Sequence, residues 1–135
     1  MNMNLYAYGK GDDQKWIIVD MGVTFADDTI PGVDLIMPDP GFIIDKKDDL
    51  LGIVLTHAHE DHIGAVAHIW PELKCKLYAT PFTAALLTEK FKEKKIDISS
   101  FLKIVPLNSQ IKLGHFEIDF VTLTHSILEP NGLSI

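Results

Sequence analysis

The sequence has a single cysteine and lacks any long apolar run. An intramolecular disulfide and a thiolate-cluster zinc site both need more than one cysteine, so both are excluded. The longest apolar run covers residues 50–55, far short of the roughly 18 residues that cross a bilayer. No basic-then-apolar signal region follows Met1. We therefore expect a cytoplasmic protein with no membrane association, in which Cys75 is a small packing residue.

Basic residues are also scarce. Twelve lysines and arginines face nineteen aspartates and glutamates, which gives a formal net charge of −7. The resulting field repels polyanions and disfavours a nonspecific nucleic-acid coat protein. A nuclease is not excluded, because bound divalent cations would supply positive charge that the formal count omits.

The length of 135 residues and a hydrophobic fraction of 47% fit one globular domain whose core needs no structural metal. Strand-like and helix-like segments alternate, which predicts an α/β or α+β fold. Pro71 should stop the first helix, and Thr80 should cap the second. We expect strands at 4–8, 16–19, 51–56, 76–79, 102–105 and within 110–124, a surface loop over 27–45, and helices over 61–70 and from residue 81 to about 94.

Four potential metal ligands, His57, His59, Asp61 and His62, occupy six positions where a strand ends and a helix begins. Side chains alternate along a strand, so His57 and His59 should point to one face and reach one cation. Asp61 and His62 fall in the first helical turn and should serve a second, adjacent metal. The alternative, a chance cluster on a solvated loop, has odds of roughly one in a thousand for this chain's composition.

A catalytic zinc ion takes three protein ligands and keeps an open position. His125 is the candidate third ligand, because it ends the strand 118–124 and strand ends meet at one sheet edge in α/β folds. Asp20 also ends a strand, and it either accepts backbone amides in a turn or hydrogen-bonds to the ligands and orients them without binding the metal. His68 and His115 are expected to be ordinary surface residues.

These residues resemble the signature of the metallo-β-lactamase superfamily. Within it, the segments 3–9, 20–22, 32–39, 55–65 and 124–127 are similar to the ribonuclease J branch. The resemblance implies an αββα sandwich with a dinuclear zinc site, or possible Mn²⁺ use, that hydrolyses RNA phosphodiesters. It assigns His57, His59 and His125 to the first metal, and Asp61 and His62 to the second metal and to catalysis.

The same resemblance implies parts that residues 1–135 do not supply: a bridging aspartate, a last histidine, an inserted β-CASP domain and a C-terminal domain. Glu129 does not match the bridging aspartate. We therefore expect a single partial domain, the N-terminal half of the sandwich, with a mixed sheet and two main helices and no activity of its own. Half a sandwich should leave one sheet face apolar, to be covered by self-association or by a second chain.

Two other functions remain open. The chain could be a non-enzymatic binding or assembly module that inherited the histidines from an enzyme ancestor and uses its apolar face for binding. It could also be another hydrolase of the superfamily, such as a thioesterase similar to glyoxalase II, although the segment 124–127 favours the ribonuclease J branch.

Overall fold

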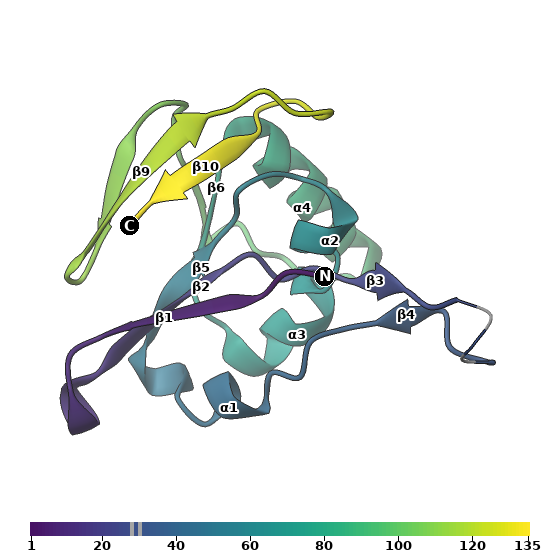
Figure 1. Ribbon diagram of the computed structural model, residues 1–135, viewed down its shortest axis with the longest axis horizontal. Helices are drawn as coiled ribbons and strands as arrows, with labels where there is room; N and C mark the ends of the chain where they lie inside the picture. Colours follow the sequence, from purple (N-terminus) through teal and green to yellow (C-terminus); the bar gives the residue numbers. More distant parts are fainter. Residues whose placement is uncertain (28, 30) are drawn as a thin grey trace.

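The computed structural model describes residues 1–27, 29 and 31–135. Its main sheet has the strand order β1-β2-β5-β6-β7, and a second sheet has the order β10-β9-β8. Figure 1 shows the second sheet lying over the main sheet, with α3 and α4 on the opposite side. The main-sheet strands are β1 (Asn4–Tyr8), β2 (Lys15–Val19), β5 (Leu50–Val54), β6 (Leu77–Ala79) and β7 (Leu102–Ile104).

The second sheet consists of β8 (Gln110–Leu113), β9 (Phe116–Thr122) and β10 (Asn131–Ser134), and β3 (Thr24–Phe25) pairs with β4 (Leu35–Ile36). The helices are α1 (Gly41–Ile44), α2 (Glu60–Ile63), α3 (Val66–Leu73) and α4 (Pro81–Glu93), with short 3-10 turns at Gly11–Asp13 and Lys47–Asp49. None of the helices in the described part of the chain has the length and apolar character needed to cross a bilayer.

Strand direction determines where a site can form. β1 and β2 form an antiparallel hairpin, whereas β2, β5, β6 and β7 run parallel to one another. The carboxyl ends of β2 and β5 therefore open on the same edge of the main sheet, where α/β proteins usually bind ligands. Asp20 follows β2 at this edge, and His57 follows β5.

The main sheet separates two apolar cores, because neighbouring residues of each strand face opposite sides. On β2, Ile18 joins the core under the helices, whereas Ile17 joins the core between the sheets. Cys75 lies in the helix-side core, and burial raises the pKa of its thiol to about 12. A thiol in that state is a packing residue and not a nucleophile.

The predicted apolar, uncovered sheet face is wrong for the described residues. Helices cover one side of the main sheet, and Ile118 and Phe120 of β9 pack on the other. The outward side of the second sheet is largely polar, with Gln110 donating to Asp119 at 2.9 Å and Lys112 lying 3.5 Å from Glu117. The expected reason for self-association is therefore missing from this face.

The helix predicted over 61–70 is instead two helices, α2 and α3. The break arises because the Ala65 amide donates to the Met21 carbonyl at 3.0 Å, while the Asp61 carbonyl accepts from the Asn2 amide at 2.8 Å. The helical bond between Asp61 and Ala65 is thus replaced by bonds to the segment that precedes β1 and the segment that follows β2. Such long-range partners leave no trace in helical periodicity.

Pro71 does not stop the helix, contrary to our prediction, because α3 continues to Leu73 and ends at Lys74 in the left-handed conformation. Proline removes one backbone bond, and the buried side chains of Trp70 and Leu73 hold the last turn in the core. The loop predicted over 27–45 contains β4 and the single turn α1, and its residues 28 and 30 lie outside the described residues. β10 was not predicted.

Candidate metal centre

Three histidines from two distant segments meet at the carboxyl edge of the main sheet. His57 and His59 follow β5, and His125 follows β9. The ring centroids are 4.9 Å apart for His57 and His59, 5.0 Å for His57 and His125, and 4.8 Å for His59 and His125. One ligand nitrogen from each ring lies within 4.8 Å of the others. Zinc–imidazole bonds are about 2.0–2.1 Å long, so small ring rotations would let the three share one ion.

His57 carries the clearest sign of a missing ligand. Its side chain is buried, and among the described residues its Nε2 atom has no hydrogen-bond partner. The other ring nitrogen, Nδ1, lies 2.9 Å from the Thr56 hydroxyl. A buried polar atom without a partner costs free energy unless another group satisfies it. A cation between the three rings would satisfy Nε2, so the residues present fit a metal ion.

Asp20 lies behind the histidines and contacts Thr56 and His62. Its backbone is left-handed, with φ of 60°, and its Oδ1 accepts the Thr56 amide at 2.8 Å. Its Oδ2 lies 2.8 Å from the Thr56 hydroxyl and 2.7 Å from Nδ1 of His62. If the hydroxyl donates to Asp20, its oxygen accepts Nδ1–H of His57. That arrangement leaves the Nε2 lone pair of His57 free for a metal.

The surroundings shift the pKa values of His57 and His62 in opposite directions. Burial, followed by repulsion from His62, lowers the pKa of His57 to about 4, so this ring is neutral near pH 7. Burial also acts to lower the pKa of His62, but the hydrogen bond and charge of Asp20, with the charge of Asp61, outweigh it and raise that pKa. A neutral His57 is the form that binds a metal.

The residues predicted for a second metal lie beside the first group. The His62 ring is 3.9 Å from the His57 ring, and its Nε2 lies 3.4 Å from Oδ2 of Asp61. The Asn2 side-chain nitrogen lies between them, 3.1 Å from Nε2 of His62 and 3.2 Å from Oδ2 of Asp61. Asp61 and His62 are thus adjacent, but Asn2 contacts the atoms that would face a second ion.

The two remaining histidines, His68 and His115, lie away from the candidate site. His68 is exposed on α3, and His115 lies in the turn between β8 and β9, with its ring 4.7 Å from that of Tyr8. Sequence reasoning missed Asn2, Thr56 and Asn131 as neighbours of the site. Thr56 gave a weak signal, a hydroxyl directly before His57, whereas the contacts of the other two depend on chain segments that are distant in sequence.

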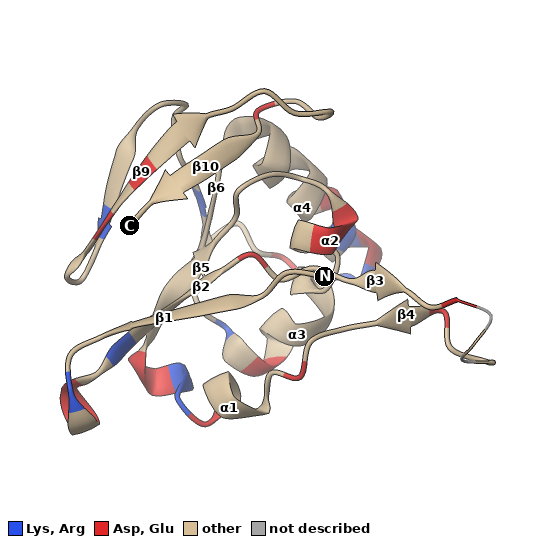
Figure 2. Ribbon diagram, viewed as in Figure 1, with Lys and Arg blue, Asp and Glu red and all other residues tan. Residues whose placement is uncertain are grey.

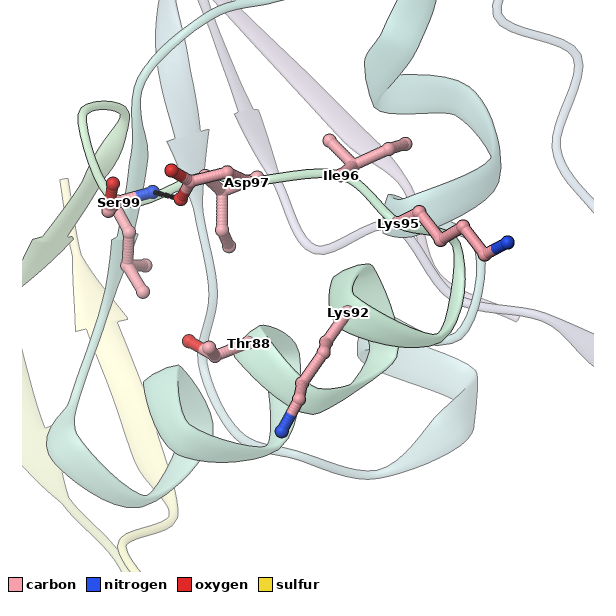
Figure 3. Close-up of a pocket in the computed structure, with 8 residues that line it drawn as sticks. Thr88, Lys92, Lys95, Ile96, Asp97 and Ser99 are labelled. Atoms are coloured by element: carbon pink, nitrogen blue, oxygen red, sulfur yellow. Dashed lines mark hydrogen bonds between the residues drawn. The ribbon is translucent and has the colours of Figure 1, made fainter.

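A cavity of about 510 Å³ lies at the C-terminal end of α4. Figure 3 shows the lining residues Thr88 and Lys92 on α4, and Ile96 and Asp97 on the loop that follows it. The first turn of α4 contacts the segment after His125, through Phe82 and Glu129. α4 has 13 residues, or about 20 Å at 1.5 Å per residue. The cavity is therefore separate from the histidine cluster.

Comparisons with known proteins agree with this geometry. The sequence model of the metallo-beta-lactamase superfamily matches residues 3–129. Ribonuclease J of Sinorhizobium meliloti is 42% identical over 137 residues, covering 100% of this chain and 24% of that protein. Ribonuclease J of Helicobacter pylori strain 26695 is 39% identical over 120 residues, covering 88% of this chain and 17% of that protein. The chain thus spans a quarter or less of the length of these two relatives.

Solved structures show the same fold at low sequence identity. A flavodiiron protein from Giardia intestinalis superposes with a TM-score of 0.61 at 14% identity, covering 97% of this chain and 29% of that one. A B3 metallo-beta-lactamase with an active-site glutamic acid gives a TM-score of 0.61 at 14% identity, covering 97% and 50%. The family match and the histidine cluster together indicate a divalent-metal site. The chain therefore belongs to the metallo-beta-lactamase superfamily.

Proposed function

We propose that this chain provides the metal-binding part of an RNA phosphodiester hydrolase of the ribonuclease J type. The observation that carries the proposal is the buried Nε2 of His57, which lacks a partner among the described residues and belongs to a ring beside His59 and His125. The relatives named ribonuclease J support RNA as the substrate. We expect the protein to act in the cytoplasm.

In this proposal His57, His59 and His125 hold the first ion, which we expect to be zinc, with Mn²⁺ as the alternative. Asp61 and His62 contribute to a second ion and to catalysis, and Asp20 orients the ligands. A bound divalent ion would polarise the phosphoryl group and make water a better nucleophile. The chain's own residues would fix the ligand geometry. Asp20 holds Nδ1 of His62, so Nε2 is the nitrogen that would face the second ion, and it would have to exchange its contact with Asn2 for the metal.

We further propose that the 135 residues alone do not hydrolyse RNA. Within the described part of the chain, the second ion would have Asp61 and His62 but no bridging carboxylate beside them. Additional ligands and most of the RNA-binding surface would come from further polypeptide, in the same chain or in a partner.

Zinc binding tests the metal site directly. Equilibrium dialysis followed by elemental analysis should find about one zinc ion per chain, as a three-histidine site predicts. His57→Ala and His59→Ala should each abolish stoichiometric binding, whereas His68→Ala, a histidine exposed on α3, should bind as the wild type does. Equal zinc content in all four proteins would contradict the proposal.

Substrate assays test the chemistry. The zinc-loaded chain should leave a 5′-monophosphorylated RNA oligonucleotide intact, and it should also fail to hydrolyse a small thioester. RNA cleavage that disappears in His57→Ala would show that the chain is a complete nuclease. Thioester hydrolysis without RNA cleavage would instead favour the glyoxalase II-like alternative.

A further inference from the structure

We propose that Glu129 and Asn131 are positioning residues that clamp the His125 loop against the end of β5 and the start of α4. This inference rests on the proposed function, because it assigns the clamp the task of holding the third metal ligand beside His57. It concerns the segment 123–131, which joins β9 to β10.

Asn131 ties the loop to the residue that precedes His57. The Asn131 backbone amide donates to the Thr56 carbonyl at 3.2 Å, and its side-chain Nδ2 donates to the same oxygen at 3.1 Å. Nδ2 also donates to the Glu129 carbonyl at 2.8 Å. Asn131 is only 4% exposed, so water competes little for these bonds.

Glu129 ties the loop to α4. Its Oε2 accepts the backbone amide of Phe82, in the first turn of α4, at 2.8 Å. The residue in the N-cap position, Thr80, makes no side-chain capping bond within the described structure. Glu129 therefore takes over the capping role, and a carboxylate at a helix N-terminus is also favoured by the helix dipole.

The loop that precedes these two anchors and carries His125 is closed and packed. The Leu123 amide donates to the Pro130 carbonyl at 2.9 Å, which joins the two ends of the loop, and Ile127 packs against the helix-side core. Glu129 itself has a left-handed backbone, with φ of 51°. Non-glycine residues adopt this conformation at a cost, so the surrounding bonds must hold it in place.

His125 depends on this clamp because its own side chain is exposed, so burial does not fix it. Its position therefore follows the backbone of the loop. Releasing either anchor should let His125 move away from His57 while the main sheet, whose strands pair independently of the loop, stays folded.

Zinc affinity, measured by competition with a chromophoric chelator, tests the clamp. Glu129→Ala and Asn131→Ala should each weaken binding by about 10–100-fold, the usual effect of losing a group that orients a ligand. Glu129→Gln keeps an acceptor oxygen and should retain most of the affinity. Glu117→Ala, an exposed position on β9, is the matched control and should leave the affinity unchanged. Circular dichroism and thermal melting would report any loss of folding separately.

A second readout needs no metal. In the metal-free chain, nuclear Overhauser contacts between the ring protons of His57 and His125 should be present in the wild type and in Glu129→Gln but lost in Glu129→Ala. If the wild type binds no zinc yet these contacts follow the predicted order, the clamp stands and the proposed function fails. Unchanged contacts and unchanged zinc affinity in folded Glu129→Ala and Asn131→Ala would overturn the clamp.

Discussion

At the scale of single residues, Thr56 connects the groups behind the candidate site. Its hydroxyl lies within 3.0 Å of both carboxylate oxygens of Asp20 and 2.9 Å from Nδ1 of His57. One hydroxyl can donate to the aspartate and accept from the imidazole at the same time. The orientation of His57 therefore depends on a side chain that need not touch a metal itself.

Replacing this hydroxyl should weaken metal binding without disrupting the fold. Thr56→Val keeps the branched shape but removes the acceptor for Nδ1–H of His57. We expect zinc affinity to fall by about 10–100-fold and the free energy of unfolding to fall by about 1–2 kcal/mol. Competition titrations and urea unfolding would measure the two effects.

Matched variants make this test specific. Thr56→Ser restores the hydroxyl and should recover most of the zinc affinity. Thr122→Val makes the same change at an exposed position at the end of β9 and should alter neither quantity. Wild-type affinity in Thr56→Val would show that the hydroxyl does not orient His57.

At the scale of secondary-structure elements, local sequence patterns predicted most strands and α4. Backbone hydrogen bonds between distant segments determined the features that the patterns missed. The strand alternation used for His57 and His59 does not reach them, because β5 ends at Val54. The two rings nevertheless lie 4.9 Å apart, and the His125 ring lies 4.8 Å from that of His59. The Ala65 amide bonds to Met21 across the chain and divides the predicted helix. Asn131 was missed for the same reason, because its partner Thr56 is 75 positions away.

The contact between the segment after β2 and α2 is tight enough to test. A Cβ atom added at Gly22 would lie 1.7 Å from the Asp61 carbonyl oxygen and 2.5 Å from the His62 amide nitrogen. Both are backbone atoms, so they cannot rotate away. Gly22→Ala should therefore push α2 from its place and lower the free energy of unfolding by about 1–3 kcal/mol or more, as measured by urea unfolding.

Gly41 offers a matched control for this prediction. A Cβ there would meet only the side chain of Asp39, at 3.2 Å, and alanine is a better helix former than glycine. Gly41→Ala should leave the free energy of unfolding within about 1 kcal/mol of wild type. Equal stability of the two variants would show that the close approach of Gly22 to α2 is absent in solution.

At the scale of the whole molecule, the distribution of charge limits what the chain can bind unaided. All twelve basic residues are lysines, against nineteen acidic residues. Figure 2 shows acidic positions on α2, next to the candidate site, and lysines dispersed over separate elements. Glu60 on α2 pairs with Lys90 of α4, which reduces the positive charge available there.

We therefore expect the isolated chain to bind RNA weakly. Without arginine forks and with a net charge of −7, few phosphates are neutralised, and counterion release contributes little. In EDTA at about 150 mM salt, fluorescence anisotropy with a labelled single-stranded RNA should give a Kd weaker than about 100 μM. The double variant Glu117→Lys and Asp119→Lys, which reverses two charges on the outward side of β9, should bind more tightly and with a steeper salt dependence. Micromolar, salt-sensitive binding by the wild type in EDTA would mean that the local arrangement of its lysines, and not its net charge, governs contact with RNA.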